Sequence, residues 1–171
     1  MVFIKDYMTQ ASIKGVEVVE EYQFSYGKNL RCGYTTGSCA TAAAKAAAMM
    51  LLTGERIEIV RIDTPKGIVL NLEPLEVILT DDYVCCAIRK DSGDDPDDTN
   101  GVLVYAKVEK TSEPGIKLCG GIGVGTVTKP GLACSVGEPA INPTPRKMIT
   151  SELTKVMEEV NYTGGLQVTI F

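Results

Sequence analysis

The sequence predicts an α+β fold in which two principal helices, at about 38–53 and 145–160, pack on one face of a mainly antiparallel sheet. Small or apolar residues recur with helical spacing in those two stretches, and β-branched runs separated by short turns fill residues 55–110. The order is therefore helix, several antiparallel strands, helix and a last strand. A length of 171 residues with 44% hydrophobic residues suits one such domain.

The start of the chain contains a peripheral segment and then the first helix. Residues 1–30 are mixed and weakly patterned, and we expect them to form a peripheral N-terminal segment, with the α+β domain spanning 31–171. The stretch RCGYTTG is a loop by its glycine and threonine content. An alanine-rich helix follows it, with Thr36 or Ser38 as the expected N-cap and Gly54 as the left-handed C-cap.

Five strands are predicted between the two helices, and turn residues separate several of them. IEIVRI and VYAKV alternate apolar and polar residues, as half-buried antiparallel strands do. Pro65-Lys66-Gly67 and Asp81-Asp82 supply the turn chemistry. The five predicted strands are 55–63, 68–73, 75–80, 83–90 and 102–110.

The C-terminal part contains three loops, the second helix and a last strand. The loops are acidic at 91–101, glycine-rich at 120–131 and proline-rich at 137–146. Pro145 suits a first helical turn, and a Thr-Gly-Gly sequence ends the helix. LQVTIF (166–171) begins a strand, and the sequence ends there. Because domains usually end at a solvated terminus or a tied-down element, we expect this chain to be the N-terminal part of a longer protein. The apolar stripe of the second helix consists of Met148, Ile149, Leu153, Val156, Met157 and Val160.

Composition excludes several classes of function. The net charge of -5 argues against general nucleic-acid binding, which needs a basic surface. No run of 18 apolar residues predicts a membrane span, and MVFIKDYMTQ is not a signal peptide, so we expect a cytoplasmic protein with reduced cysteines. The absence of histidine excludes His-based zinc sites, nucleophiles and general bases, and we expect no protein-bound metal.

The sequence YTTGS before the first helix is a candidate anion site. Backbone N–H groups at a helix start are unsatisfied and carry partial positive charge. Thr35, Thr36, Gly37 and Ser38 would let a carboxylate or phosphate approach those groups closely. The alternative is a plain N-cap on a buried helix, for which one hydroxyl would be enough.

The glycine loop GGIGVGTVTKPG is a candidate ligand loop. Gly121, Gly123 and Gly125 expose backbone N–H groups, and Lys129 follows them. The sequence is neither a P-loop, because GK[ST] is absent, nor a strong dinucleotide fingerprint, because TVTKPG cannot open a helix. The alternative is a strained or flexible turn between strands.

Charged residues mark two further candidates. DSGDDPDDTNG could bind a hard cation, but the register of an EF-hand loop fails, so an acidic solvated turn is favoured. One of its carboxylates could still act as a base. Arg146 and Lys147 lie near a helix start, where cations oppose the dipole. They indicate an acidic ligand or a partner carboxylate such as Glu138, with a surface charge pair as the alternative.

Four motifs in this order closely resemble the CbiD family, from about Leu30 to the C-terminus. They are LRCGYTTGSCATAAAKAA, DPDDTNG, GGIGVGTVTKPGL and VGEPAINPTPRKMI. The resemblance implies a cobalt-precorrin-5B (C-1)-methyltransferase of anaerobic cobalamin biosynthesis, which gives cobalt-precorrin-6A. It also implies a longer chain with a second, C-terminal α/β half, which is absent here.

The resemblance to the CbiD family implies roles for the candidate residues. The methyl donor is S-adenosylmethionine, the substrate is a cobalt-corrinoid rich in acetate and propionate groups, and the cobalt belongs to the substrate. Thr35, Thr36, Gly37, Ser38, Lys129 and Arg146 would hold substrate carboxylates. Gly121, Gly123, Gly125 and Thr126 would contact the donor. Asp95, Asp97 and Glu138 are the candidates for moving a proton, although alignment and exclusion of water can carry most of the catalysis.

Two other functions remain open at this stage. A Gly/Ser loop leading into an alanine-rich helix also resembles small-molecule kinases of the GHMP type, which would bind magnesium-ATP. A non-catalytic fragment that binds tetrapyrrole carboxylates is the other alternative. We expect no nucleic-acid or membrane partner, and either a homo-oligomer or association with the missing C-terminal half.

Overall fold

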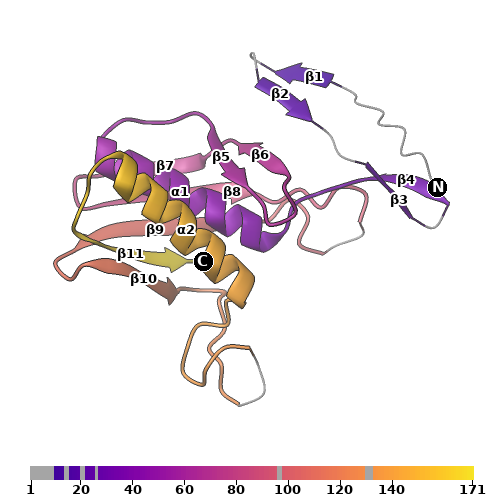
Figure 1. The fold of residues 1–171 in the computed structure, drawn as a ribbon. Helices are drawn as coiled ribbons and strands as arrows, with labels where there is room; N and C mark the ends of the chain where they lie inside the picture. Colours follow the sequence, from indigo (N-terminus) through magenta and orange to yellow (C-terminus); the bar gives the residue numbers. More distant parts are fainter. Residues whose placement is uncertain (1–9, 14–15, 20–21, 26, 96–97, 130–132) are drawn as a thin grey trace.

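The computed structural model describes residues 10–13, 16–19, 22–25, 27–95, 98–129 and 133–171. Its centre is a five-stranded sheet with two helices on one face, which confirms the α+β prediction (Figure 1). The order of strands across the sheet is β10-β11-β9-β8-β7. These elements are α1 (Thr36–Thr53), β7 (Leu75–Leu79), β8 (Tyr83–Arg89), β9 (Leu103–Thr111), β10 (Gly115–Gly120), α2 (Pro143–Glu159) and β11 (Gly165–Ile170).

The sheet is antiparallel except for the pairing of β10 with β11, which is parallel. Side chains alternate along β9, so Val104, Ala106 and Val108 are buried against the helices. Val108 lies opposite Val84 on β8 and Val168 on β11, and all three side chains are fully buried. This face of the sheet forms one side of the hydrophobic core, as the alternating pattern predicted.

Helix α1 is buried by the sheet, by α2 and by the β5–β6 hairpin, where β5 is Val60–Asp63 and β6 is Val69–Leu72. Its alanines are at most 5% exposed. A helix with neighbours on several sides cannot carry large side chains on all of them, and alanine lets each neighbour approach the backbone without loss of helix propensity. The alanine run therefore reflects close packing on several sides.

Replacing Ala47 with leucine should overpack this helix. Ala47 is fully buried, so the added carbons would displace α2 or the sheet, at a cost of about 1–3 kcal/mol in the free energy of unfolding. Urea denaturation followed by circular dichroism measures it. The control is Met49→Leu at a partly exposed position of the same helix, where we expect a change below about 1 kcal/mol. Equal stability of Ala47→Leu and the parent would show that the helix has free space beside it.

Helices α1 and α2 run in the same direction, side by side (Figure 1). A Cβ atom at Gly37 would lie 2.6 Å from Cγ of Pro145, so the first turns are in contact. Further along, Lys45 on α1 donates to Glu152 on α2 at 2.6 Å. The N-terminal ends of both helices, with their partial positive charges, therefore lie at the same end of the domain.

Two short hairpins precede the domain and lie beside it rather than in the sheet (Figure 1). The peripheral segment at 1–30 and the domain boundary at 31 stay predictions, and parts of that segment fall outside the described residues. The hairpins are β1 (Gln10–Ile13) with β2 (Val16–Val19), and β3 (Tyr22–Ser25) with β4 (Lys28–Arg31).

Several boundaries differ from the sequence prediction. β5 begins at Val60 rather than at residue 55, because the polar residues before it are exposed and unpaired with any strand. β10 was missed, since a short run between glycines carries little strand signal. α2 spans Pro143–Glu159, so it begins two residues before the predicted start and ends before the Thr-Gly-Gly sequence. The last glycine of that sequence, Gly165, is the first residue of β11. Gly54 is the left-handed C-cap of α1, with φ 74°, as predicted.

Two further observations concern membranes and thiols. In the part of the chain that the structure describes, no helix combines the length and apolarity needed to cross a membrane. All six cysteines are free thiols, and Cys39 and Cys86 are buried. Burial raises the pKa of both thiols to about 12, so neither supplies a thiolate nucleophile near neutral pH.

Candidate functional site

The start of α1 is held by hydroxyl groups. Thr35 is the N-cap, and its Oγ1 accepts a hydrogen bond from the backbone N–H of Ser38 at 3.1 Å. The expectation of Thr36 or Ser38 as the cap was therefore wrong by one position or more, because the extended backbone falls at Thr35. The Ser38 hydroxyl lies 3.1 Å from the same oxygen, and Thr41 Oγ1 donates to the Gly37 carbonyl at 2.8 Å.

The segment before α1 crosses the acidic loop and pairs with it. The backbone N–H of Asp94 donates to the Arg31 carbonyl at 3.0 Å, and the N–H of Tyr34 donates to the Asp91 carbonyl at 2.8 Å. Between these bonds lies an antiparallel bridge of Cys32 with Gly93. Parts of the motifs LRCGYTTGS and DSGDDPDDTNG, about 60 residues apart in sequence, thus form one unit at the start of the helix. We call this unit the motif crossing and define it as residues 31–38 and 91–95.

An ion pair holds the motif crossing together. Arg31 donates from Nη1 to Asp91 Oδ2 at 2.6 Å and from Nη2 to Oδ1 at 2.8 Å, the bidentate geometry that an arginine fork favours. The Gly93 N–H also donates to Asp91 Oδ1 at 2.8 Å. The hydrogen bonds from Arg31, with a smaller one from Gly93, hold the pKa of Asp91 below its ordinary value despite partial burial. One carboxylate of the acidic loop therefore already has a counter-charge from the protein, in a pair whose side chains are about a third exposed.

A cavity of about 310 Å³ lies beside the motif crossing. Tyr34, Glu73 and Arg89 line it with three apolar side chains. The Tyr34 hydroxyl donates to the Arg89 carbonyl at 3.0 Å, and burial, helped by nearby negative groups, raises the pKa of Tyr34 to about 12. Tyr34 therefore stays a neutral phenol near pH 7, and the Arg89 guanidinium is the cationic group of this cavity.

Residues 121–129 of the glycine loop and residues 133–142 form one projecting arm between β10 and α2, which we call the arm (Figure 1). Thr126 bridges Pro139, and the Val127 N–H donates to the Glu138 carbonyl at 2.9 Å. Arg146 closes the base of the arm, because its Nε and Nη2 donate to the Ile141 and Pro139 carbonyls at 2.8 and 2.7 Å. The arm thus joins the sheet directly to the first turn of α2.

Comparison with known proteins identifies the family. The family model CbiD matches residues 23–171. The chain belongs to the CbiD family. The match covers the motif crossing, the arm and both helices, so it agrees with the resemblance drawn from the four motifs.

Two similar proteins have the same name. The chain is 54% identical over 152 residues to a cobalt-precorrin-5B C(1)-methyltransferase of a Thermoanaerobacter species, covering 89% of this chain and 41% of that protein. It is 51% identical over 152 residues to a protein of the same name from Ruminiclostridium cellulolyticum, covering 89% of this chain and 39% of that one. The chain thus spans about two fifths of the length of these relatives.

A solved CbiD structure has a similar fold. The crystal structure of a cobalamin biosynthesis protein from Archaeoglobus fulgidus matches with a TM-score of 0.61 and 32% sequence identity, over 87% of this chain and 46% of that chain. The similarity agrees with a folded unit that corresponds to part of a longer family member.

The structure brings some of the predicted CbiD site residues together and separates others. Thr35, Thr36, Gly37 and Ser38 lie at the motif crossing with Asp95, against the first turn of α2. Arg146 lies 3.4 Å from Glu138, the partner carboxylate that the sequence suggested. Gly121, Gly123, Gly125, Thr126 and the exposed Lys129 lie on the arm. Asp97 lies outside the described residues.

Sequence reasoning missed the charged residues that build the motif crossing. Arg31 and Asp91 were not singled out as partners, since nothing in a single sequence links residues 60 positions apart. Lys90 is 5% exposed, and its Nζ donates to the Ser92 hydroxyl. The sequence feature that could have indicated this is the position of Lys90 at the end of the apolar run YVCCAIRK. A charge at a buried position there is costly unless it is paired.

Among the described residues, no group of three or more Cys, Asp or Glu side chains is arranged to hold a metal ion. Asp91 of the acidic loop is bonded to Arg31. In the region that the structure describes, the carboxylates of Asp91 and Asp94 both accept hydrogen bonds from Arg31.

Proposed function

We propose that this chain is part of an S-adenosylmethionine-dependent methyltransferase that methylates C-1 of cobalt-precorrin-5B to give cobalt-precorrin-6A in anaerobic cobalamin biosynthesis. The observation that carries the proposal is the 54% and 51% identity to relatives named for this activity, over 89% of the chain. Since the chain spans about two fifths of those relatives, complete activity is proposed for the longer polypeptide. The family match favours this function over a GHMP-type kinase.

The proposed substrate contact is the helix end where α1 and α2 begin. A corrinoid acid carries acetate and propionate groups, and a helix N-terminus with small hydroxyl residues is suited to a carboxylate. Thr36, Gly37 and Ser38 supply that helix start, and Pro145 of α2 packs against it. The pairing of Arg31 with Asp91 supports the proposal, because it neutralises a carboxylate that would repel an anionic ligand.

Lys129 and Arg146 are the further proposed substrate contacts, and they differ in exposure and in their present hydrogen bonds. Lys129 is exposed on the arm. Arg146 already donates to two carbonyls and lies 3.4 Å from Glu138, so its guanidinium mainly fixes the arm. A substrate carboxylate at Arg146 would have to take the place of Glu138. We therefore expect Lys129 to contribute more to the electrostatic attraction of the substrate.

The reaction needs alignment more than acid or base catalysis. The macrocycle supplies the electron pair of the new bond between C-1 and the methyl carbon, and the sulfur keeps the pair of the broken bond, which gives S-adenosylhomocysteine. Positive charge passes to the macrocycle, and loss of a proton removes it. Asp95 and Glu138 are the proposed acceptors of that proton among the described residues, and Asp97 stays a sequence-based candidate.

Thermal unfolding tests the proposed substrate class. A ligand that binds only the folded state at about 100 times its Kd stabilises it by about 2.7 kcal/mol. We expect cobalt-precorrin-5B to raise the Tm of the chain by several degrees and magnesium-ATP to leave it unchanged. Protection by magnesium-ATP alone would support the kinase hypothesis instead. No protection by the corrinoid would contradict a substrate site in this part of the protein.

A further inference from the structure

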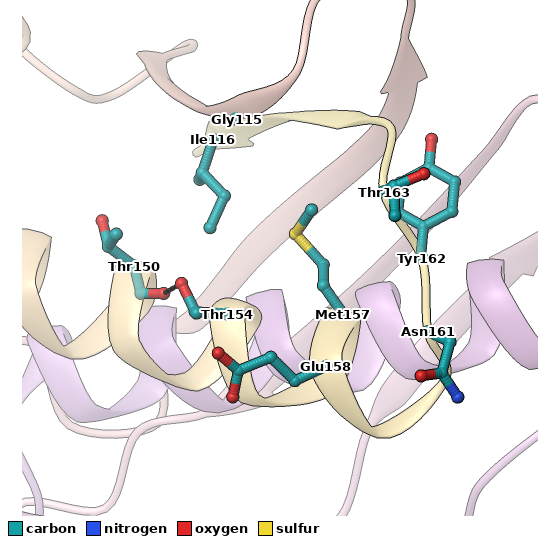
Figure 2. A pocket seen from close by; sticks show the side chains of 9 residues that line it. All are labelled: Gly115, Ile116, Thr150, Thr154, Met157, Glu158, Asn161, Tyr162 and Thr163. Atoms are coloured by element: carbon teal, nitrogen blue, oxygen red, sulfur yellow. Dashed lines mark hydrogen bonds between the residues drawn. The ribbon is translucent and has the colours of Figure 1, made fainter.

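A groove of about 700 Å³ lies between the outward face of α2 and the start of β10 (Figure 2). None of its lining residues is among the site residues assigned above. Thr150, Thr154, Met157 and Glu158 line it from the helix, and Tyr162 lines it from the segment that follows. In Figure 2 the side chains of Met157 and Ile116 approach each other across it. The groove therefore combines a hydroxyl-rich wall with an apolar floor.

The charge of the groove is negative. Glu158 is the ionisable acid among its lining residues, and none of those residues is a lysine or arginine. Glu158 also lies in the last turn of α2, where the helix dipole is negative and a carboxylate is unfavourable. Glu159 opposes the dipole in the same way, but Glu158 is the carboxylate at the wall of the groove, and a carboxylate there with no lysine or arginine in the lining favours a cationic ligand.

The remaining groups suit the uncharged parts of such a ligand. The Tyr162 ring and the Met157 side chain offer apolar contacts, and a cation over an aromatic ring is attracted to it. Thr154 donates its proton to the Thr150 carbonyl at 2.8 Å, so its oxygen lone pairs remain to accept a hydrogen bond. β10 is an edge strand of the sheet, so the backbone N–H and C=O groups of alternate residues along it are not used by the sheet.

The groove and the substrate end share helix α2. Thr150 lies seven residues after Pro143, the first residue of α2, and Glu158 lies fifteen residues after it, which is about 10 Å and about 22 Å along the axis at 1.5 Å per residue. A corrin macrocycle with its acid side chains is wider than the first of these distances, and the donor would have to meet the side of the macrocycle that lies away from the helix start. A macrocycle held by its carboxylates at the helix start could therefore extend toward the near end of the groove.

We propose that this groove binds S-adenosylmethionine, with the Glu158 carboxylate facing the sulfonium. The inference rests on the proposed methyltransferase function and gives the domain two complementary ends. The helix starts are positive and suit the anionic substrate, whereas the groove is negative and suits the cationic donor. Hydroxyl groups of the threonines would meet the ribose, and Tyr162 and Met157 would meet the apolar faces.

The glycine loop is the competing place for the donor. Its first glycine has a structural use, because a Cβ atom at Gly121 would lie 2.4 Å from the Phe171 ring. Gly125 differs, since the nearest heavy atom to a Cβ there is Ala140 Cβ at 3.9 Å, an ordinary contact. Gly125→Ala is therefore tolerated by the fold, but the added methyl group would obstruct a ligand on the backbone of the loop.

Isothermal titration of the 171-residue chain with S-adenosylmethionine and S-adenosylhomocysteine tests the inference. The two ligands differ by the methyl group and the sulfonium charge. We expect wild type to prefer S-adenosylmethionine, and Glu158→Gln to weaken its binding by about three- to tenfold while affecting S-adenosylhomocysteine less. Glu159→Gln is the matched control, because Glu159 is the neighbouring carboxylate of the same turn and does not line the groove. It should bind both ligands as wild type does.

The possible results separate the hypotheses. Weaker binding in Gly125→Ala with unchanged binding in Glu158→Gln would overturn the inference and place the donor at the glycine loop. An equal effect of Glu158→Gln and Glu159→Gln would reduce the effect to general charge and would also overturn it. If wild type binds neither ligand, the groove inference fails, whereas protection by the corrinoid still decides the proposed substrate class separately.

Discussion

Replacing Gly93 with alanine is expected to disrupt the motif crossing and to lower the free energy of unfolding by about 3 kcal/mol or more. A Cβ atom at Gly93 would lie 2.1 Å from the Arg31 carbonyl oxygen and 2.6 Å from the Gly33 nitrogen. Both contacts are with backbone, which cannot rotate away. The two segments would have to separate, with loss of the Cys32 bridge and of the hydrogen bonds beside it.

Gly101→Ala separates the clash from backbone strain. Gly93 has φ +64° and Gly101 has φ +80°, so alanine is strained at both positions. A Cβ atom at Gly101 meets nothing within 4 Å, so we expect a loss of only about 1 kcal/mol there. Chemical denaturation of both variants gives the comparison. Equal losses would mean that the close approach of the two motifs contributes nothing, contrary to the geometry described above.

Removing the charge of Glu152 should cost about 3 kcal/mol. Glu152 is 4% exposed and accepts hydrogen bonds from Lys45 and Lys155 at 2.6 Å each, and Lys45 also donates to the Arg61 carbonyl at 2.7 Å. Glu152→Gln keeps the shape of the side chain but leaves two ammonium groups without their counter-charge. The pair is a charged contact between α1 and α2, in addition to the apolar packing of the two helices.

The effect of Glu152→Gln should depend on pH. Burial by itself raises the pKa of Glu152, but hydrogen bonds and charge from Lys155 and Lys45 outweigh it, so the pKa lies below its ordinary value. The stabilisation is therefore fully present above the unfolded pKa of about 4.3 and is lost as the pH falls through the lower folded pKa. Urea denaturation from pH 7 to pH 3 should show the difference between wild type and variant shrinking.

The matched control is Glu109→Gln. Glu109 accepts from Lys107 at 2.8 Å on the open face of the sheet, where both side chains are about a third exposed. An exposed pair of this kind contributes at most about 1 kcal/mol. If Glu152→Gln were no more destabilising than Glu109→Gln, or if its cost were the same at pH 3, the buried ion pair would not be holding the helices together.

The alternating and helical patterns predicted most of the domain because they report burial directly. β8 and β9 lie within a residue or two of their predicted bounds, since one face of each strand packs on the helices. The alanine helix was predicted for the same reason. The parallel β10–β11 pair was not predicted, because β10 is a six-residue run bounded by glycines and its partner lies about 50 residues later.

The candidate site was predicted only in part. The hydroxyl cluster at Thr35–Ser38 was visible in sequence because it exceeds what a cap needs. The ion pair of Arg31 with Asp91 was invisible, since it depends on two segments crossing at glycines with no room for a side chain. The groove at Glu158 was also missed, because a helix face and a strand edge become one wall only in three dimensions.

Mapping a corrinoid acid onto the folded chain tests the central claim most directly. The measurement is a titration of the isotopically labelled chain with cobyrinic acid, followed by the backbone amide signals in two-dimensional NMR, with the fully methyl-esterified corrinoid as a control. We predict that the acid shifts the signals of Thr36, Gly37, Ser38 and Cys39 and of the acidic loop, and that the ester does not. Shifts confined to other surfaces, or equal shifts with acid and ester, would contradict a substrate site at the start of α1.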